Sequence, residues 1–214
     1  MNHLITIVNI LLLKGILLAQ APDILWTKTF GGSTAGGGYS VQETSDGGLI
    51  IAGQVGNGNG WLIHTDASGD TLWTRNYGEE GVRNAGRTVQ QTSSGGFIMS
   101  GGILGGRCTP SCNSKPWLVR IDASGNTIWT RSYSAGSSYW WDYTVQQTSD
   151  GGFIVAGVDT SSKVLLLRTD SFGDTLWTRT YGRADIDVGH SVQQTADSGF
   201  IVVGNYTILR RWLW

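Results

Sequence analysis

Four side chains that could bind a sugar or a carboxylate occupy the same position of an internal repeat. Each is followed by a hydroxyl residue, a valine and a Gln-Gln or Gln-Glu pair, and the four are Tyr39, Arg87, Tyr143 and His190. Aromatic rings with a polar tip offer flat contact surfaces, and guanidinium and imidazolium groups bind carboxylates. We therefore name these four as candidate ligand-binding residues. The alternative is that they fill the centre of the fold and hydrogen-bond to one another.

A second candidate site is the run Trp140-Trp141-Asp142, which only one repeat contains. An exposed tryptophan pair beside a carboxylate suits stacking on a sugar ring, because exposed apolar groups of this size usually mark contact surfaces. We add Trp140, Trp141 and Asp142 to the candidate ligand-binding residues. The alternative is that both indoles pack beneath their own loop.

The chain offers few groups for catalysis or metal binding. Hydrolysis of a glycan needs a placed acid and base, and the groups available are His190 and the loop carboxylates Glu79, Glu80, Asp185 and Asp187. These carboxylates could hold Ca²⁺ if they converged, but we interpret them as solvated loop charge. The sequence therefore predicts no catalytic residue, no metal site and no cofactor.

Cys108 and Cys112 are the only two cysteines of the chain. A zinc site needs about four nitrogen or sulfur ligands, and no histidine or further cysteine lies near this pair in the sequence. In an exported protein two such cysteines more often form a disulfide. We therefore expect a local disulfide between Cys108 and Cys112.

Residues 1–21 are predicted to be a signal peptide that is removed before folding. The segment Leu4–Leu13 is largely apolar, and Ala19-Gln20-Ala21 offers small residues for cleavage. Lys14 interrupts the apolar run, so the alternative is a retained N-terminal anchor. The protein is therefore expected to be secreted or at the cell surface, with no membrane span in the mature chain. A net charge of −1 gives no basic footprint for nucleic acid.

A fourfold repeat determines the expected fold. One signature, a hydroxyl residue followed by Val-Gln-Gln-Thr or Val-Gln-Glu-Thr, begins at residues 40, 88, 144 and 191. A second, Asp-x-x-Gly-x-x-x-Trp, ends at Trp73, Trp129 and Trp177, and its tail recurs at Trp26. Each unit is about 48 residues long and is predicted to form four antiparallel strands, a to d. In the first unit these strands are residues 39–44, 49–52, 61–65 and 71–77.

Four-stranded units of this length are typical of β-propeller blades. We predict an all-β β-propeller of about four blades over residues 22–214, with full blades at 39–77, 87–133 and 143–181 and an incomplete blade at 190–214. Residues 22–30 are expected to form a lone strand d that completes the last blade and closes the ring, which would make the protein monomeric. The alternative is a truncated arc of a larger propeller.

Residues that recur in every unit are interpreted as structural. The aspartates that open the c–d turns are expected to cap nearby amides, and they are Asp66, Asp122 and Asp170. The tryptophans of strand d are expected to be buried, which stabilises each by about 2–3 kcal/mol. His64 aligns with Arg120 and Arg168 on strand c and is expected to face solvent.

The Asp-Ala-Ser-Gly-x-x-x-Trp segment resembles the tryptophan-docking motif of quinoprotein-type (PQQ-like) β-propellers, with one residue fewer between Asp and Gly. It is also similar to the Asp-box of sialidase-like propellers, with different spacing. The whole repeat is most similar to repeats of bacterial secreted propeller proteins of unassigned activity. The resemblance covers residues 22–214 and implies the fold, export and a bacterial source. It implies no chemistry, and the quinone cofactor is not carried over.

The tight a–b and c–d turns are expected on one face of the propeller and the variable b–c and d–a loops on the other. Function concentrates on loops that a rigid scaffold presents. We therefore predict a non-enzymatic secreted or cell-surface binding or adhesion module that uses the variable-loop face, with a glycan or an extracellular protein as ligand. The alternatives are a glycan-active hydrolase or lyase with its site on the same face, or a fragment of a longer propeller protein.

Overall fold

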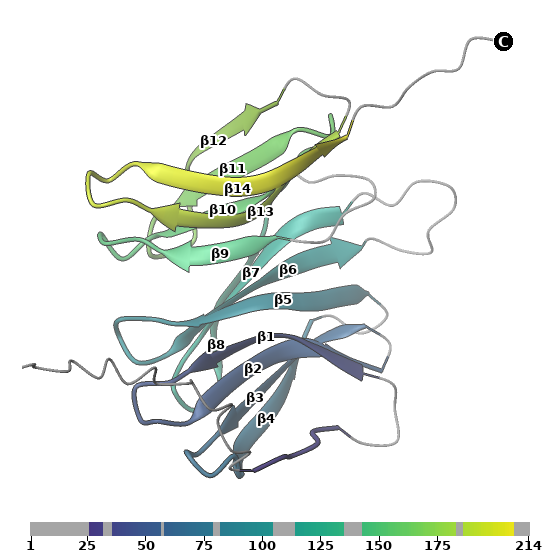
Figure 1. Ribbon diagram of the computed structural model, residues 1–214, viewed down its shortest axis with the longest axis vertical. Helices are drawn as coiled ribbons and strands as arrows, with labels where there is room; N and C mark the ends of the chain where they lie inside the picture. Colours follow the sequence, from purple (N-terminus) through teal and green to yellow (C-terminus); the bar gives the residue numbers. More distant parts are fainter. Residues whose placement is uncertain are drawn as a thin grey trace, which may run out of the picture.

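Antiparallel sheets stacked along one direction make up the computed structural model (Figure 1). It describes residues 26–31, 36–56, 58–78, 82–104, 114–134, 143–182 and 186–207. Within these residues no helix has the length and hydropathy needed to cross a bilayer.

The described residues form four sheets, three with four strands and one with two. The first contains β1 (Gly36–Glu43), β2 (Leu49–Val55), β3 (Asn59–Thr65) and β4 (Thr71–Tyr77). The second contains β5 (Arg83–Gln91), β6 (Phe97–Leu104), β7 (Ser114–Ile121) and β8 (Thr127–Ser132). The third contains β9 (Thr144–Gln147), β10 (Phe153–Val158), β11 (Val164–Thr169) and β12 (Thr175–Tyr181). The fourth contains β13 (Ile186–Gln194) and β14 (Phe200–Thr207).

The first strand of each sheet is its innermost strand. Strands β1, β5, β9 and β13 lie next to one another in this order, and each sheet packs face to face on the next (Figure 1). This is the arrangement of propeller blades around an axis. The chain therefore has the expected all-β, propeller-like fold with about four blades. We call the sheets blades 1 to 4.

The a–b turns have one geometry in all four blades. In blade 1, Thr44 N–H donates to Gly48 O and Gly47 N–H donates to Thr44 O, both at 2.9 Å. The third turn residue has a positive φ, 81° at Gly47, which glycine adopts without a steric penalty. In blade 4 this residue is Ser198, with a φ of 66°.

The c–d turns are held by the repeated aspartates, as predicted. Asp66 Oδ1 accepts the main-chain N–H groups of Ser68 at 2.9 Å and Asp70 at 2.8 Å. The same pair of bonds recurs at Asp122 and at Asp170. Hydrogen bonds from the main chain and side chain of Asn126 hold the pKa of Asp122 below its ordinary value.

The apolar core lies between blades rather than within one sheet. At the first junction Ile50 and Leu62 of blade 1 pack with Val89 and Phe97 of blade 2, and all four are buried. The strand-d tryptophan completes each core, with its ring centroid 5.8 Å from Phe97 in the case of Trp73. Each blade therefore buries its apolar surface only because the next blade covers it.

In blades 1 and 2 the strand-d tryptophan, Trp73 or Trp129, also docks on the c–d turn of the following blade. Trp73 Nε1 donates to Ala123 O at 3.1 Å, and a Cβ at Gly125 would lie 3.2 Å from the Trp73 ring. Tyr77 adds a hydrogen bond from its hydroxyl to Gly125 O at 2.8 Å. Burial raises the pKa of Tyr77, so this hydroxyl stays a donor.

Glutamine side chains join the inner strand of each blade to that of the next. Gln42 Oε1 accepts the N–H of Gln91 at 2.8 Å, and Gln91 Oε1 accepts the N–H of Ser45 at 2.8 Å. We call this reciprocal pair of bonds the glutamine clasp. The glutamines that form it at the next two junctions are Gln90 with Gln147, and Gln146 with Gln194. Inner strands are edge strands, and the clasp pairs N–H groups that the ladder leaves free.

The expectation that His64 faces solvent is wrong. His64, Arg120 and Arg168 are all buried. In blade 1 the next blade covers this position, and the His64 ring centroid lies 5.5 Å from that of Trp73 and 5.4 Å from that of Phe97 in blade 2. Arg168 donates to both carboxylate oxygens of Asp150 in its own a–b turn, at 2.5 and 2.6 Å. His64 Nε2 lies 3.7 Å from the equivalent carboxylate, that of Asp46. The residue at this position of strand c therefore lies beside the a–b turn of its own blade and links the two.

The described residues 26–31 do not form the lone strand expected over residues 22–30. They lie against blade 1, where Lys28 forms an ion pair with Asp70. A Cβ at Gly69 would lie only 2.8 Å from the indole of Trp26. Trp26 thus docks on the c–d turn of blade 1 as Trp73 docks on that of blade 2. This contact holds residues 26–31 at the outer edge of the first blade.

We predict that Ser198→Gly stabilises the protein by about 1 kcal/mol, because a side chain is unfavourable at positive φ. The measurement is the free energy of unfolding in urea. Ser149→Gly, at a turn position without positive φ, is the control and should not stabilise. A Ser198→Gly protein no more stable than the unaltered chain would contradict this account of the turn.

We predict that Asp150→Asn lowers the free energy of unfolding by about 1 kcal/mol at pH 7, since the largely exposed carboxylate is screened by water. A hydrogen bond from the Thr148 hydroxyl is the main reason that the pKa of Asp150 is lowered. Its contribution is therefore present above about pH 4 and is lost as pH falls through the folded-state pKa.

Urea titrations at a series of pH values check this. The difference between the two proteins should shrink below about pH 4. Asp46→Asn is the matched control, with the same threonine bond but a more distant partner in His64, and should cost less. A difference that stays constant down to pH 2 would be inconsistent with an ionised Asp150.

Candidate functional site

Three of the four candidate residues stand on β-bulges of the inner strands. The pairing register shifts between Gly38 and Ser40, between Gly86 and Thr88, and between Gly189 and Ser191. The residue inside each shift is Tyr39, Arg87 or His190. A bulge leaves one residue out of the ladder and turns its side chain in a new direction.

The glycine before the bulge lets neighbouring chains approach closely. A Cβ at Gly86 would lie 2.7 Å from Met99 Sδ and 3.1 Å from Gly53 O of the preceding blade. The contact with the main-chain oxygen of Gly53 is tighter than most Cβ contacts, whereas Met99 Sδ lies near the end of a flexible side chain that can move aside. Glycine therefore allows blade 2 to bulge while it stays packed on blade 1.

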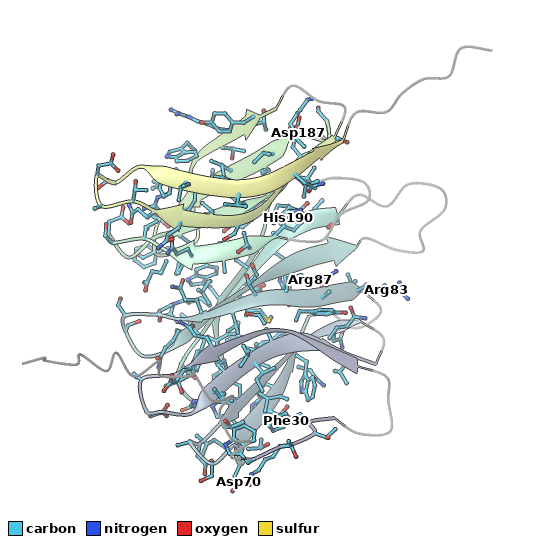
Figure 2. All side chains as sticks on the ribbon, viewed as in Figure 1. Phe30, Asp70, Arg83, Arg87, Asp187 and His190 are labelled. Atoms are coloured by element: carbon cyan, nitrogen blue, oxygen red, sulfur yellow. The ribbon has the colours of Figure 1, made fainter. Side chains whose placement is uncertain are left out.

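All four candidate residues line one hollow on the inner strands, with a volume of about 230 Å³. The remaining lining residues are Thr88 and Thr144, which follow Arg87 and Tyr143 in the chain. Figure 2 shows Arg87 and His190 on inner strands of different blades. The structure thus brings together Tyr39, Arg87, Tyr143 and His190, and their role as ligand-binding residues stays a prediction.

Arg87 and Tyr39 form a stacked pair across the first junction. The guanidinium carbon of Arg87 lies 4.2 Å from the centroid of the Tyr39 ring. A cation over the face of an aromatic ring is stabilised by the ring quadrupole. Tyr39 nevertheless keeps 46% of its surface exposed. One face of the hollow therefore offers an accessible ring and a positive charge.

His190 forms a close contact with an amide rather than with a carboxylate. Its Nε2 lies 2.5 Å from Oδ1 of Asn205 on β14, so the imidazole donates and the amide oxygen accepts. His190 is otherwise exposed. This contact fixes the orientation of the imidazole ring.

Tyr143 differs from its three counterparts. Its side chain is fully buried, and its hydroxyl donates to Ser114 O and Val158 O at 3.3 and 3.4 Å. The pairing of β9 with β10 contains no register shift. Without a bulge the ring enters the core between blades. Tyr143 thus packs in the core between blades 2 and 3 rather than filling the centre of the fold, as the alternative interpretation would have it.

Several candidate residues lie outside the described residues: Trp140, Trp141, Asp142, Cys108, Cys112, Glu79, Glu80 and Asp185. The remaining loop carboxylate, Asp187, is a buried residue of β13. It forms an ion pair with Lys163 at 3.5 Å. Among the residues that the structure describes, no three His, Cys, Asp or Glu side chains gather as a metal site would require.

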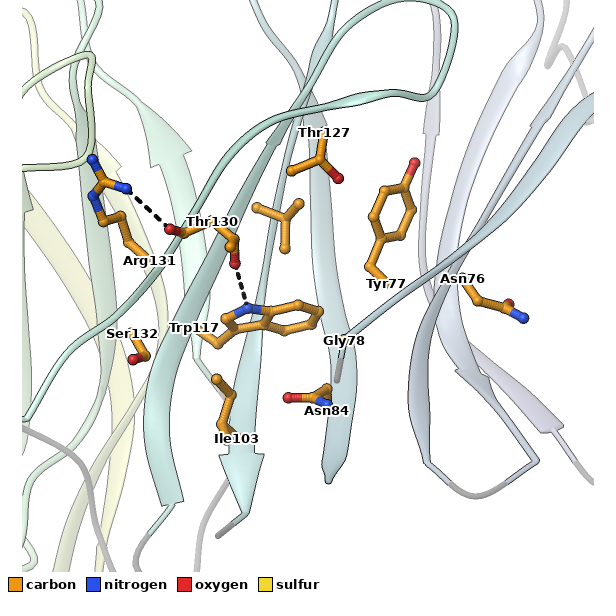
Figure 3. Close-up of a pocket in the computed structure, with 11 residues that line it drawn as sticks. Asn76, Tyr77, Gly78, Asn84, Ile103, Trp117, Thr127, Thr130, Arg131 and Ser132 are labelled. Carbon is orange, nitrogen blue, oxygen red and sulfur yellow. Dashed lines mark hydrogen bonds between the residues drawn. The ribbon is translucent and has the colours of Figure 1, made fainter. Parts of the chain in front are cut away.

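A larger hollow of about 300 Å³ lies between blades 1 and 2, but its polar groups bond within the protein (Figure 3). Trp117 Nε1 donates to Thr130 Oγ1 at 2.8 Å, and Tyr77 is bonded to the neighbouring turn. Another, of about 730 Å³, lies beside Trp177 and Phe200 between blades 3 and 4. At the first two junctions the equivalent surface is covered by the third strand of the following blade, which is β7 in blade 2 and β11 in blade 3.

The glutamines of the clasp were not assigned a role from the sequence. Their signal was the near-identity of the Val-Gln-Gln-Thr segment in all units. A polar residue that never varies between repeats must bond to something that also repeats, and here it is the neighbouring inner strand. The clasp fixes the strands that carry the hollow.

Comparison with known proteins adds no assignment. No family model matches the chain, and no curated protein matches it. A crystal structure of a protein of unknown function from Bacteroides caccae is similar over 68% of this chain and 68% of that chain, with 11% sequence identity and a TM-score of 0.29. A similarity of this size supports no inference. The resemblance to quinoprotein-type repeats therefore stays a prediction.

The two tyrosines at the same repeat position should respond differently to truncation. We predict that Tyr143→Ala lowers the free energy of unfolding by about 3–5 kcal/mol, because it leaves a cavity in the core. Tyr39→Ala should cost less than about 1 kcal/mol, since that ring is half exposed. Urea unfolding of both variants checks this, and equal losses would show that Tyr39 is a core residue too.

Proposed function

We propose that this protein is a non-enzymatic binding module, secreted or at the cell surface, that holds a glycan in the hollow on its inner strands. One observation carries the proposal: separate bulges turn Tyr39, Arg87 and His190 toward one hollow. Bulges of this kind are frequent beside functional sites because they re-aim side chains. The loops that vary between units are expected on the same face.

The chemistry of the hollow favours a sugar that carries a carboxylate. The exposed ring of Tyr39 offers a flat apolar surface, and the stacked guanidinium of Arg87 supplies a fixed positive charge. The volume of about 230 Å³ lies below the usual range for small-molecule pockets, roughly 300–1,000 Å³. The hollow therefore suits one terminal sugar residue rather than a length of chain.

Binding is favoured over hydrolysis by the groups that line the hollow. Glycoside hydrolysis normally uses two carboxyl groups about 5–10 Å apart. The described lining residues are tyrosine, threonine, arginine and histidine, with His190 bonded to an amide. This set can orient and neutralise an acidic ligand, and it lacks the paired acid and base of a hydrolase.

A glycan array that includes uronic-acid-bearing and neutral glycans tests the proposal. The unaltered protein should bind acidic glycans, and Tyr39→Ala should weaken this binding by about tenfold or more, as expected for loss of a stacking contact. Arg87→Gln should remove the preference for acidic over neutral glycans.

Phe172→Ala is the matched control, because it removes an exposed aromatic ring from a c–d turn. It should leave glycan binding unchanged. Binding that survives Tyr39→Ala, or an array without any bound glycan, would contradict a glycan ligand. Turnover of a bound glycan would favour the hydrolase or lyase alternative.

A further inference from the structure

Both ends of the blade stack expose the surfaces that the internal junctions bury. In blades 2, 3 and 4 the valine of the inner strand is 6–7% exposed, at Val89, Val145 and Val192. The equivalent Val41 in blade 1, the first of the described blades, is 64% exposed. We call the surface around Val41 and Glu43 the leading face.

The opposite end shows the complementary surface. Ile50, Ile98 and Ile154 of the second strands are fully buried, because the following blade covers them. Their counterpart in blade 4, Ile201, is 56% exposed, and Val203 beside it is 64% exposed. We call this surface of β14, with Gln193 and Ala196 of the adjoining turn, the trailing face. An internal junction is a trailing face packed on a leading face.

Only the inner end of the leading face is exposed, and this is the part that the two described strands of blade 4 could cover. Its outer end is occupied by residues 26–31, with Trp26 on Gly69 in the place of the tryptophan of a preceding blade. Its inner end, formed by β1, is free. The described part of blade 4 consists of the two inner strands β13 and β14. The two bare surfaces therefore match in position.

The polar groups of the two end faces also correspond. At the first junction Gln91 Oε1 accepts Ser45 N–H, and its Nε2 donates to the Ser45 hydroxyl at 3.2 Å. On the leading face glutamate replaces this glutamine, at Glu43, and on the trailing face alanine replaces this serine, at Ala196. Neither the glutamine Nε2 nor the serine hydroxyl that form the second of these bonds is therefore present on the end faces. Glu43 can still accept the N–H of Ala196, and Gln193 can accept the N–H of Glu43.

We propose that the trailing face of one chain binds the leading face of a second copy of this chain, through a fourth glutamine clasp and the packing of Ile201 and Val203 on Val41. Figure 1 places β14 and β1 in different parts of the stack, with two blades between them. Val41 and Val203 are each 64% exposed, so the two end faces are not in contact within one chain in this structure.

Two copies complete the assembly. A head-to-tail contact between identical chains forms either a ring or an open filament. Propellers typically have four to eight blades, so two chains with about four blades each reach the upper end of this range and three chains exceed it. The contact between a trailing face and a leading face therefore forms twice, and the two chains together close one ring.

Light scattering during size-exclusion chromatography tests the proposal on the purified chain. The unaltered protein should have twice the mass of one chain. Val41→Asp and Val203→Asp should each have the mass of a single chain, because each places a charge in a contact that must be dry. Ile128→Asp is the matched control, an exposed apolar side chain on β8 that is 57% exposed and on neither end face, and should stay dimeric.

Mixing the two variants distinguishes binding of a second copy from closure within one chain. The Val41→Asp chain keeps its trailing face and the Val203→Asp chain keeps its leading face, so an equimolar mixture should regain a species of twice the single-chain mass. Circular dichroism of each variant verifies its fold. If one variant is unfolded, Glu43→Lys and Gln193→Ala serve as the pair.

Three outcomes would overturn the proposal. The first is an unaltered protein with the mass of one chain, which would indicate closure within the chain or an unused end face. The second is a mixture of folded variants that does not associate. The third is a filament whose mass grows with concentration instead of stopping at two chains.

Discussion

The glutamine clasp is the interaction on which the rest of the structure depends. A blade whose first strand lies at an edge presents main-chain N–H groups that no strand of its own sheet can pair. Gln42, Gln90 and Gln146 accept those groups in the following blade, and the partner glutamines return a bond to the preceding a–b turn. Because the bonds are made by side chains of fixed length, they set both the spacing and the register of successive blades.

The place of each residue within its repeat unit could be predicted from the sequence, whereas its degree of burial in the fold could not. Strand β4 has the expected bounds, and the aspartates of the c–d turns cap the expected amides, because both depend on nearby residues. The exposure of His64 was misjudged because alternation along one strand cannot show that the next blade covers that face of the sheet. Arg168, at the same position, is likewise buried against its own turn.

The candidate site shows the same division. The alignment of units correctly brought Tyr39, Arg87 and His190 to one place. It could not separate them from Tyr143, because a bulge depends on the pairing register and on a glycine that packs against the neighbouring blade. Tyr143 follows Asp142 in the sequence and the other three follow glycine. Comparing the residue before each aligned position would have been the signal.

Identical junctions have a genetic consequence. The three described junctions use equivalent glutamines, and the first two use an equivalent docked tryptophan. A duplicated or deleted unit of about 48 residues would therefore meet its new neighbours through contacts that already exist. In-frame recombination between the repeated segments would therefore change the number of units without requiring any compensating substitution. Such a gene can vary in length while the surface that each unit presents diverges independently.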